Sequence, residues 1–512
     1  MNDLSQPVET PSADFAKAGA YLTENALQDA VLAEYLAHGD VEGAELAPIN
    51  ALKGGLRWVS DWGWMRWNGK YWAKVPEPVA IDIVRISLKE LFMGAMSQNA
   101  SPTTNSMFKV LLNKNKATNV AFFLRGLLAT DASEFDAYPD LLNCQNGIVN
   151  LSTGLSMGHH PRYMLTKITA VGYVPEAEHP DWTQALEAMP ADIREYMQTR
   201  YGQAATGHPV DDDVLIIQKG GGQNGKSTIM EGITKSLGDY GVVVPEKVLL
   251  ASPGEHPTEL MTLRGARFAL IEETPEGHRL PTKRLKDLVG TPTMTARAMR
   301  QDFVSWDVSH TIFVDTNYDL QVAETDHGTW RRLQLVNFPY KYVHPSEPLM
   351  APNDRHGVPG LREHIRDNRD GQLEAVLAWV IAGARRWYLN DRAQSATPYI
   401  IQADTERWRA EADLILAYAQ ERLVFTPNVN TPSKELFEDF SDWLRDSGRQ
   451  VWNDQTFSSR FGTHDLANRN HISKKRINLQ ESTIMSRRWP SNNSVLSGKV
   501  SVWHGVSFAR NS

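Results

Sequence analysis

The sequence predicts an α/β protein with a layered core in the middle of a multi-domain chain. Between residues 213 and 340, the apolar runs VLIIQ, FALIEE, TIFVDTN and LQLVNF alternate with helix-like or loop-like segments. This alternation is typical of an α/β layer fold. The segment GGGQNGKST at 220–228 stands between the first of these runs and a helix-like stretch. A chain of 512 residues has room for about three or four domains of ordinary size.

The composition is that of a globular protein without a membrane span. Hydrophobic residues make up 41% and charged residues 22% of the chain, and no apolar run approaches the ~20 residues that a span requires. The N-terminus has neither the basic start nor the apolar core of a signal peptide. Cys144 is the only cysteine, which excludes an intrachain disulfide and a cysteine-based zinc cluster. We therefore expect a cytoplasmic protein without a structural metal and without a membrane partner.

Charge is distributed unevenly along the chain, whose formal net charge is −8. Residues 1–50 hold nine acidic residues and one lysine, whereas residues 431–512 hold twelve basic and eight acidic residues. An acidic total does not exclude nucleic acid, because a cleft needs only a few cations where the phosphates run.

The region before the core predicts helices and short strands. Residues 57–75 alternate around Asn68-Gly69, a dipeptide suited to a type I′ hairpin turn. Five aromatic residues between 62 and 72 could stack on bases, but cross-strand packing is their commoner use and is our prediction. Helices are predicted over 77–130 and 182–202. Short strands are predicted over 139–173, with a second Asn-Gly turn at Asn146-Gly147.

The region after the core predicts a helical segment and then a small separate unit. Residues 361–422 look helical, with a break at QSATP, 394–398. The small unit follows the Pro/Asn-rich FTPNVNTP at 425–432, where Thr431 before Pro432 predicts the start of the helix KELFEDFSDWL.

The segment Gly220-x-x-x-x-Gly225-Lys226-Ser227 fits the P-loop pattern fully. Glycines let backbone N–H groups face phosphates, the lysine reaches the β- and γ-phosphates, and the serine hydroxyl can ligate Mg²⁺. The following helix adds its dipole to the anion site. We therefore predict that ATP and Mg²⁺ bind here. The candidate nucleotide-binding residues are Gly220, Gly221, Gly222, Gln223, Asn224, Gly225, Lys226, Ser227 and Thr228.

Two carboxylates, Glu272 and Glu273, end the apolar run FALIEE. An acid at a strand end can hold Mg²⁺, and a second can polarise the attacking water. The candidate metal ligands are therefore Ser227, Glu272 and Glu273. A solvated strand end without a catalytic role is the alternative.

Two further groups complete the candidate catalytic set. Asn317 ends TIFVDTN, where its amide could sense a γ-phosphate, while Asp315 and Thr316 could simply cap that strand. Arg331 and Arg332 precede the last apolar run, where a guanidinium could reach a phosphate of its own or of a neighbouring subunit.

These elements in this order resemble the superfamily 3 helicases, in particular the primase-helicases of phages, plasmids and poxviruses. The resemblance rests on four motifs: NGKST at 224–228, Glu273-Thr274 with Gly277, Thr316-Asn317 and the segment GTWRR at 328–332. Segments upstream (LLNCQNGIVNLSTG, HPDWTQAL, YGQAATGH) resemble the family's helicase-associated domain. TPSKELFEDFSDWLRDSG and VWHGVSF resemble its C-terminal winged-helix-like unit.

The resemblance implies a ring-forming AAA+ motor, usually hexameric, that hydrolyses ATP between subunits and translocates on single-stranded or forked DNA. It assigns catalytic roles to Lys226, Glu273 and Asn317, a less certain role to Glu272, and the trans-acting finger to Arg332, with Arg331 as the rival. The segment MTARAMRQDFVSW at 294–306 resembles the channel hairpin, whose DNA-binding candidates are Arg297, Arg300 and Gln301. Many relatives have Lys or His at that tip, so the residue that touches DNA stays open.

The sequence-based assignment is thus a DNA helicase of a phage or mobile element, in the host cytoplasm if phage-encoded, cooperating with a separate primase or polymerase. The residues ahead of the core look too few for a primase domain. An initiator or loader without processive unwinding, and a P-loop NTPase without DNA, are the alternatives. The expected domains are an acidic segment (1–50), a mainly helical helicase-associated domain (51–205), the AAA+ core (206–345), a helical segment (346–424) and the winged-helix-like domain (425–512).

Overall fold

A computed structural model describes most of the chain, as two compact units. The described residues are 55–97, 114–250, 257–272, 279–299, 302–318, 320–322, 327–449, 451–480, 483–488 and 498–509. One unit comprises residues 1–150 with 155–172, and the other comprises residues 151–154 with 173–512. The domain boundaries expected from the sequence stay predictions.

Helices and strands alternate along the described chain. Its helices are α4 (Glu77–Ser97), α6 (Lys114–Leu127), α7 (Pro180–Leu186), α8 (Ala191–Ala204), α9 (Lys226–Leu237), α10 (Lys247–Leu250), α11 (Thr282–Val289), α12 (His327–Trp330), α13 (Leu361–Asp367), α14 (Gln372–Leu389), α15 (Tyr399–Ala412), α16 (Leu414–Arg422), α17 (Ser433–Asp446), α18 (Asp454–Thr463) and α19 (Asp465–Arg469). Among them no helix has the length and apolar character needed to cross a membrane.

The strands of the described chain fall into several small sheets and one larger one. They are β1 (Leu56–Val59), β2 (Gly63–Trp67), β3 (Trp72–Val75), β4 (Leu141–Cys144), β5 (Gly147–Asn150), β6 (Ser156–Met157), β7 (Leu215–Lys219), β8 (Gly241–Val244), β9 (Phe268–Ile271), β10 (Arg279–Leu280), β11 (Thr293–Ala296), β12 (Val304–Asp307), β13 (Thr311–Thr316), β14 (Gln321–Val322), β15 (Leu333–Asn337), β16 (Lys341–Val343), β17 (Asp354–His356), β18 (Leu423–Pro432), β19 (Ser473–Asn478) and β20 (Lys499–Phe508).

The first unit contains the predicted aromatic hairpin. Strands β1, β2 and β3 form an antiparallel sheet, and the rings of Trp67 and Trp72 pack across it with centroids 6.1 Å apart. Trp64 and Trp72 are each only 1% exposed, which confirms packing as the use of these aromatics. The type I′ prediction is wrong, because Trp67 pairs with Trp72 and leaves a four-residue loop. In that loop the Asn68 side chain accepts from two backbone N–H groups while Gly69 alone has a positive φ.

The second Asn-Gly pair also differs from the type I′ expectation. Cys144 pairs with Gly147, so the turn between β4 and β5 is Gln145-Asn146 and the glycine already belongs to the strand. The predicted short strands of this region are confirmed as the sheet β4-β5-β6.

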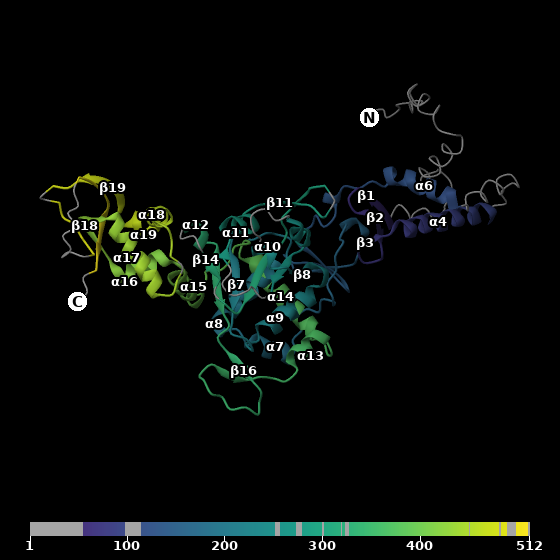
Figure 1. Ribbon diagram of the computed structural model, residues 1–512. Coiled ribbons are helices and arrows are strands. Elements are labelled where there is room, and N and C mark those ends of the chain that lie inside the picture. The colour runs from purple at the N-terminus through teal and green to yellow at the C-terminus, as the bar shows by residue number, and fades with distance from the viewer. Residues whose placement is uncertain are drawn as a thin grey trace, which may run out of the picture. The chain divides into compact units, whose positions relative to one another are not determined.

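The second unit is built on a five-stranded sheet in the order β15-β7-β13-β9-β8, and every pair of neighbours in it is parallel. Two of its strands, β7 and β8, are labelled in Figure 1. The four strands expected from the apolar runs are confirmed. The edge strand β8 was missed, although its sequence GVVV is β-branched enough to have suggested it. A mixed α/β architecture with a parallel sheet is therefore confirmed.

Helices α8 and α14 pack together beside this sheet at close backbone distance. A Cβ atom on Gly202 would lie 2.0 Å from the backbone nitrogen of Ala384, and one on Gly383 would lie 2.0 Å from the carbonyl oxygen of Gln198. Neither position can carry a side chain without separating the helices. The ring of Tyr201 on α8 then packs on Phe313 of β13, with centroids 5.0 Å apart.

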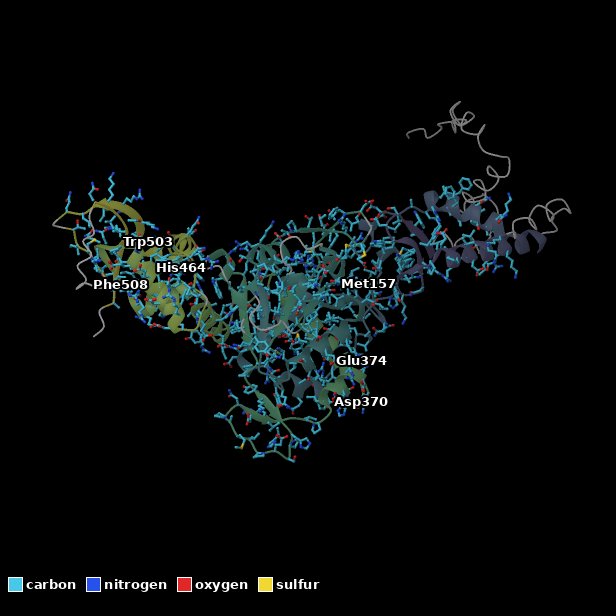
Figure 2. The ribbon with its side chains drawn as sticks, viewed as in Figure 1. Met157, Asp370, Glu374, His464, Trp503 and Phe508 are labelled. Atoms are coloured by element: carbon cyan, nitrogen blue, oxygen red, sulfur yellow. The ribbon has the colours of Figure 1, made fainter. Side chains whose placement is uncertain are left out.

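The C-terminal part of this unit is an antiparallel sheet, β18-β20-β19, packed with α16 to α19. His464 and Trp503, labelled in Figure 2, belong to this region. The Pro/Asn-rich residues 425–432 lie in strand β18, which pairs with β20 on both sides of an irregularity between Phe425 and Asn430. The Thr431 hydroxyl donates to the Val506 carbonyl instead of capping α17.

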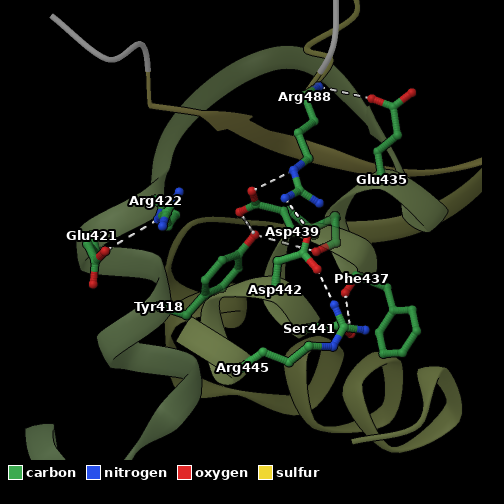
Figure 3. Close-up of polar contacts among 11 residues, drawn as sticks. Tyr418, Glu421, Arg422, Glu435, Phe437, Asp439, Ser441, Asp442, Arg445 and Arg488 are labelled. Atoms are coloured by element: carbon green, nitrogen blue, oxygen red, sulfur yellow. Dashed lines mark hydrogen bonds and ion pairs between the residues drawn. The ribbon is translucent and has the colours of Figure 1, made fainter. Parts of the chain in front are cut away.

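An ion-pair network joins residues 483–488 to α17 (Figure 3). The Arg488 guanidinium lies 3.0 Å from the Asp439 carboxylate and also contacts Asp442. The Arg488 backbone N–H donates to Glu435, and the Tyr418 hydroxyl donates to Asp439. Because Asp439 is 7% exposed and the Arg488 side chain 18%, this pair is largely shielded from water.

We predict that Arg488→Ala destabilises this C-terminal region by about 2–3 kcal/mol, because it leaves the buried Asp439 carboxylate without its cation. Arg445→Ala is the matched control, since Arg445 is 60% exposed where it pairs with Asp442 and should contribute less than about 1 kcal/mol. Hydrogen exchange of α17 and β18 in urea measures the difference. Equal protection in the two variants would contradict the prediction.

Candidate functional site

The glycine-rich loop joins β7 to α9 and exposes its backbone to solvent. Gly222, Gln223 and Gly225 have positive φ angles of 87°, 52° and 79°, and the two glycines adopt this conformation without strain. The N–H groups of Gly221, Gly222 and Gln223 have no acceptor within the described residues. Successive free N–H groups ahead of a helix N-terminus form an anion-binding nest. The loop can therefore hold phosphate oxygens.

The loop glycines also fit tightly against their surroundings on one side. A Cβ on Gly225 would lie 2.6 Å from the Cβ of Ala188, and one on Gly220 would meet the Asn224 amide. The buried Asn224 Nδ2 has no hydrogen-bond partner among the described residues. A bound ligand is one way in which a donor buried in such a loop is satisfied.

Lys226, the first residue of α9, is 4% exposed. Its ammonium donates to the carbonyl oxygen of Thr316 at 2.8 Å and to that of Gln218 at 3.4 Å. Both carbonyls lie at the carboxyl ends of parallel strands, β13 and β7. Lys226 is thereby held at the sheet edge that the loop crosses.

The other predicted groups of this edge lie on neighbouring strands. Asn317 directly follows β13, and Glu272 directly follows β9; both are exposed. Val314 pairs with Ile271, which sets Asp315 and Glu272 at the same level of the sheet. Ser227 is exposed in the first turn of α9. Glu273 lies outside the described residues.

Asp315 is a buried carboxyl group that the sequence analysis treated as a possible strand cap. It is 5% exposed, and its Oδ1 accepts from the Gln218 amide at 3.0 Å. Gln218 in turn accepts from the Tyr201 hydroxyl at 2.5 Å. The sequence signal for this buried carboxyl group was an aspartate inside the otherwise apolar strand TIFVDT. The cap interpretation of Asp315 is wrong, because its buried side chain bonds the Gln218 side chain of the neighbouring strand β7.

Burial raises the pKa of Asp315 from 3.8 to about 7. The positive charge of Lys226 lowers this pKa, and the negative charge of Glu272 raises it further. The influence of both neighbours indicates that the lysine and the two carboxyl groups lie in one electrostatic neighbourhood.

Arg331 and Arg332 lie at the opposite edge of the sheet. They stand between α12 and β15, whose first residue, Leu333, pairs with the first residue of β7, Leu215. Arg332 is 15% exposed and contacts Asp213 at 3.1 Å, whereas Arg331 is 49% exposed and lies 3.6 Å from the same carboxylate. The structure does not bring either arginine near Lys226 of the same chain.

The predicted DNA-binding hairpin is formed by β11 and β12, with Ala296 pairing with Val304. The Arg297 guanidinium lies 4.8 Å from the centroid of the Phe303 ring. Met299 and Phe303 near the tip are 80% and 60% exposed. Arg300 and Gln301 lie outside the described residues.

The exposed oxygens at the loop fit a magnesium-bound triphosphate better than a protein-enclosed metal. Within the described ranges no group of three or more His, Cys, Asp or Glu is placed to hold a metal ion. Mg²⁺ usually keeps one or two protein ligands and takes the rest from phosphates and water. The Ser227 hydroxyl and the Glu272 carboxylate are exposed and could supply such ligands.

The fold and the site together define a mixed α/β protein. Its parallel sheet carries a glycine-rich loop with the geometry of an anion-binding site. A sequence family described as "D5 N terminal like" matches residues 48–189, ahead of that loop.

Two viral relatives extend the similarity. Primase C962R of African swine fever virus (isolate Warthog/Namibia/Wart80/1980) is 27% identical over 322 residues, 60% of this chain and 33% of that protein. Helicase L207/L206 of Acanthamoeba polyphaga mimivirus is 22% identical over 324 residues, again 60% and 33%. Both names are provisional assignments, and the match spans a third of each relative. These similarities support a replication protein of the primase-helicase type.

A solved structure, the A form apo structure of the NrS-1 C-terminal region, is 13% identical with a TM-score of 0.34 over 59% of this chain and 65% of that one. A TM-score of this size supports no conclusion about the fold.

We predict that Asp315→Asn stabilises the protein at about pH 8 more than at about pH 5. With a pKa raised from 3.8 to about 7, the folded state keeps the proton that the unfolded state releases first. Wild-type stability therefore falls as the pH rises through this window. The advantage of the variant should grow by about 2–4 kcal/mol across it. Thermal unfolding at both pH values measures this, with the exposed Asp302→Asn as control. A pH-independent difference would contradict the prediction.

Proposed function

We propose that this protein is an ATP-dependent DNA helicase, with an AAA+ core of the superfamily 3 type that acts as a ring, usually a hexamer. The observation that carries the proposal is the division of the predicted catalytic groups between two sheet edges. Lys226, Glu272 and Asn317 lie at the edge formed by the carboxyl-terminal ends of the strands, called the carboxyl edge. Arg331 and Arg332 lie at the amino-terminal end of β15, at the opposite edge, called the amino edge.

The geometry supports a site completed by a second subunit. A strand rises about 3.3 Å per residue, so the five residues of β15 separate the arginine pair from the Lys226 edge by roughly 15 Å. An arginine finger must touch the phosphates to stabilise the transition state. Arg331 and Arg332 of the same chain are too far away, whereas a neighbouring subunit in a ring can present the corresponding pair.

Within the carboxyl edge each residue has a proposed role. Lys226 binds the β- and γ-phosphates, and it exchanges its contacts with the Thr316 and Gln218 carbonyls for phosphate oxygens. Ser227, Glu272 and Glu273 hold Mg²⁺, which neutralises the charge of the phosphates, and the glutamates also polarise the attacking water. Asn317 follows the strand between β7 and β9, so its amide can orient that water between the loop and the acids.

The geometry favours Arg331 over Arg332 as the finger. Arg332 donates to the Gly328 carbonyl at 2.7 Å as well as to Asp213, and its side chain is the less exposed of the two. These contacts give Arg332 a structural role within its own chain. Arg331 has only the longer contact to Asp213 among those described. Its side chain can therefore turn toward a neighbouring subunit with little loss of free energy.

Two basic elements could contact DNA. The β11–β12 hairpin carries Arg297 and, beyond the described residues, Arg300 and Gln301; this hairpin would face the DNA strand in a ring. Strand β19 at one edge of the C-terminal sheet exposes Lys474, Lys475 and Arg476. Helices packed on a small antiparallel sheet support a winged-helix-like assignment for this region. Cations at such surfaces bind phosphates without reading sequence.

The names of the viral relatives, primase and helicase, support a role in replication. A separate primase or polymerase remains the proposed partner.

We expect Lys226→Ala to lower ATP turnover at least about 100-fold, because the transition state loses its main phosphate cation. Lys235→Ala, an exposed lysine of the same helix, should leave turnover unchanged. The measurements are ATP hydrolysis with and without single-stranded DNA, and unwinding of a forked duplex. Full turnover in Lys226→Ala would refute the site. DNA-stimulated hydrolysis without unwinding would identify a loader instead of a helicase.

Mixing Arg331→Ala with Lys226→Ala should restore activity that neither variant has alone. If the finger acts in trans, about a quarter of the interfaces in an equal mixture combine an intact lysine with an intact arginine. Hydrolysis by the mixture, compared with each variant alone, measures this. A parallel mixture with Arg332→Ala is the comparison, and recovery in that mixture alone would assign the finger to Arg332. The absence of recovery in both would argue against a shared site.

A further inference from the structure

A cavity of about 360 Å³ opens beside the glycine-rich loop, a volume within the range of small-molecule sites. Three segments distant in the sequence line it. They are the end of α7 with Ala185 and Ala188, the loop and first turn of α9 with Gln223, Gly225 and Thr228, and residues 342–345 with 357–363.

The cavity lies on the side of the loop away from the predicted catalytic groups. Asn317 and Glu272 follow β13 and β9, on one side of β7, whereas the lining segment 342–345 follows β15, on the other side. A triphosphate on the loop has its γ end at Lys226 and the acids. Its nucleoside end must then point away from them, toward Thr228 and the cavity.

Tyr342 fixes one wall of the cavity to the loop. Its backbone N–H donates to the Gln223 carbonyl at 2.7 Å, and its ring atom Cε2 lies 3.5 Å from where a Cβ on Gly225 would stand. The ring is therefore held beside the turn that precedes Lys226. An aromatic face in this place can stack on a base.

Three of the polar side chains around the cavity are engaged with other groups. The Gln184 amide donates to Glu187 at 2.7 Å, Arg362 donates to Glu231 at 2.5 Å, and His344 lies 2.6 Å from the Ser346 hydroxyl. Gln223, Thr228 and Glu363 also line the cavity, but apolar residues predominate in its wall: Ala185, Ala188, Val343, Pro345, Val358, Pro359 and Leu361. Such a wall recognises a ligand by contact area more than by hydrogen bonds to its edge.

We propose that this cavity is the nucleobase pocket of the ATP site, in which the base stacks on Tyr342, and that it discriminates little between adenine and guanine. The proposal rests on the proposed binding of a triphosphate at Lys226. A site that hydrogen-bonds a base edge rejects the analogue that lacks the matching groups, whereas an apolar pocket does so only weakly.

The test uses calorimetric titration of the full chain with β,γ-imido analogues of ATP and GTP, and with inorganic tripolyphosphate, which has no base. Wild-type protein should bind the two analogues within about threefold of each other. Tyr342→Ala should weaken both by about tenfold or more and leave tripolyphosphate binding unchanged. Tyr342→Phe should keep wild-type affinity, and Tyr399→Ala, an 84% exposed tyrosine on α15, is the matched control.

Three results would overturn the pocket assignment while leaving the proposed function intact. One is an unchanged analogue affinity in Tyr342→Ala, a second is an equal loss of tripolyphosphate binding, and a third is a preference of more than about thirtyfold for one purine. Two other results would instead overturn the proposed function and the pocket with it. One is failure of the wild-type protein to bind either analogue or tripolyphosphate, and the other is binding that Lys226→Ala leaves unchanged.

Discussion

The site depends on the parallel alignment of β7 with its neighbours. Because β13, β9 and β15 run in the same direction as β7, the groups that follow the strands meet at one edge and the groups that precede them meet at the other. The loop lysine binds two carbonyls of that carboxyl edge, so the register of β7 with β13 directly positions its charge. A shift of this register by one residue would reverse which side chains face each layer.

A buried polar connection links this edge to the helices behind it. Gly202 and Gly383 allow α8 and α14 to approach closely, and α8 carries Tyr201, which donates to Gln218, which in turn donates to Asp315. Burial raises the pKa of the Asp315 carboxyl to about 7, and the positive charge of Lys226 lowers this pKa. Loss of the lysine charge would therefore change the protonation of Asp315 as well as phosphate binding, which makes the pH dependence of stability a sensitive report on this edge.

The predicted catalytic groups are divided between the two edges of the sheet, as the proposed motor with active sites shared between subunits requires. The groups proposed to bind phosphates and metal lie at one edge of the sheet, and the more exposed arginine of the pair lies at the opposite edge, where a neighbouring subunit could use it. The cavity beside Tyr342 adds a third surface, built from α7 and from residues beyond β15, so that nucleotide binding would also hold together segments that are about 150 residues apart in the sequence. ATP binding, subunit contact and base contact would thus depend on one another.

The sequence by itself determined the local elements that carry strong patterns. The glycine-rich loop between a strand and a helix, the four strands read from the apolar runs and the helix that begins at Lys226 follow from short-range glycine spacing and apolar runs, and the structure has them at the expected positions. It misjudged the turns at Asn68 and Asn146, the strand at 425–432 and the role of Asp315. In each case the outcome depended on strand pairing or burial by distant residues, which local composition does not encode.

Only the tertiary structure decided the spatial relations. Strand order placed β13 between the loop strand and β9, and the register of β15 separated the arginine pair from Lys226. The contact of Arg332 with Asp213, and the cavity walled by Ala188 and Tyr342, join residues more than a hundred positions apart. Such contacts arise from packing and charge in the folded chain, so no periodicity along the sequence could have predicted them.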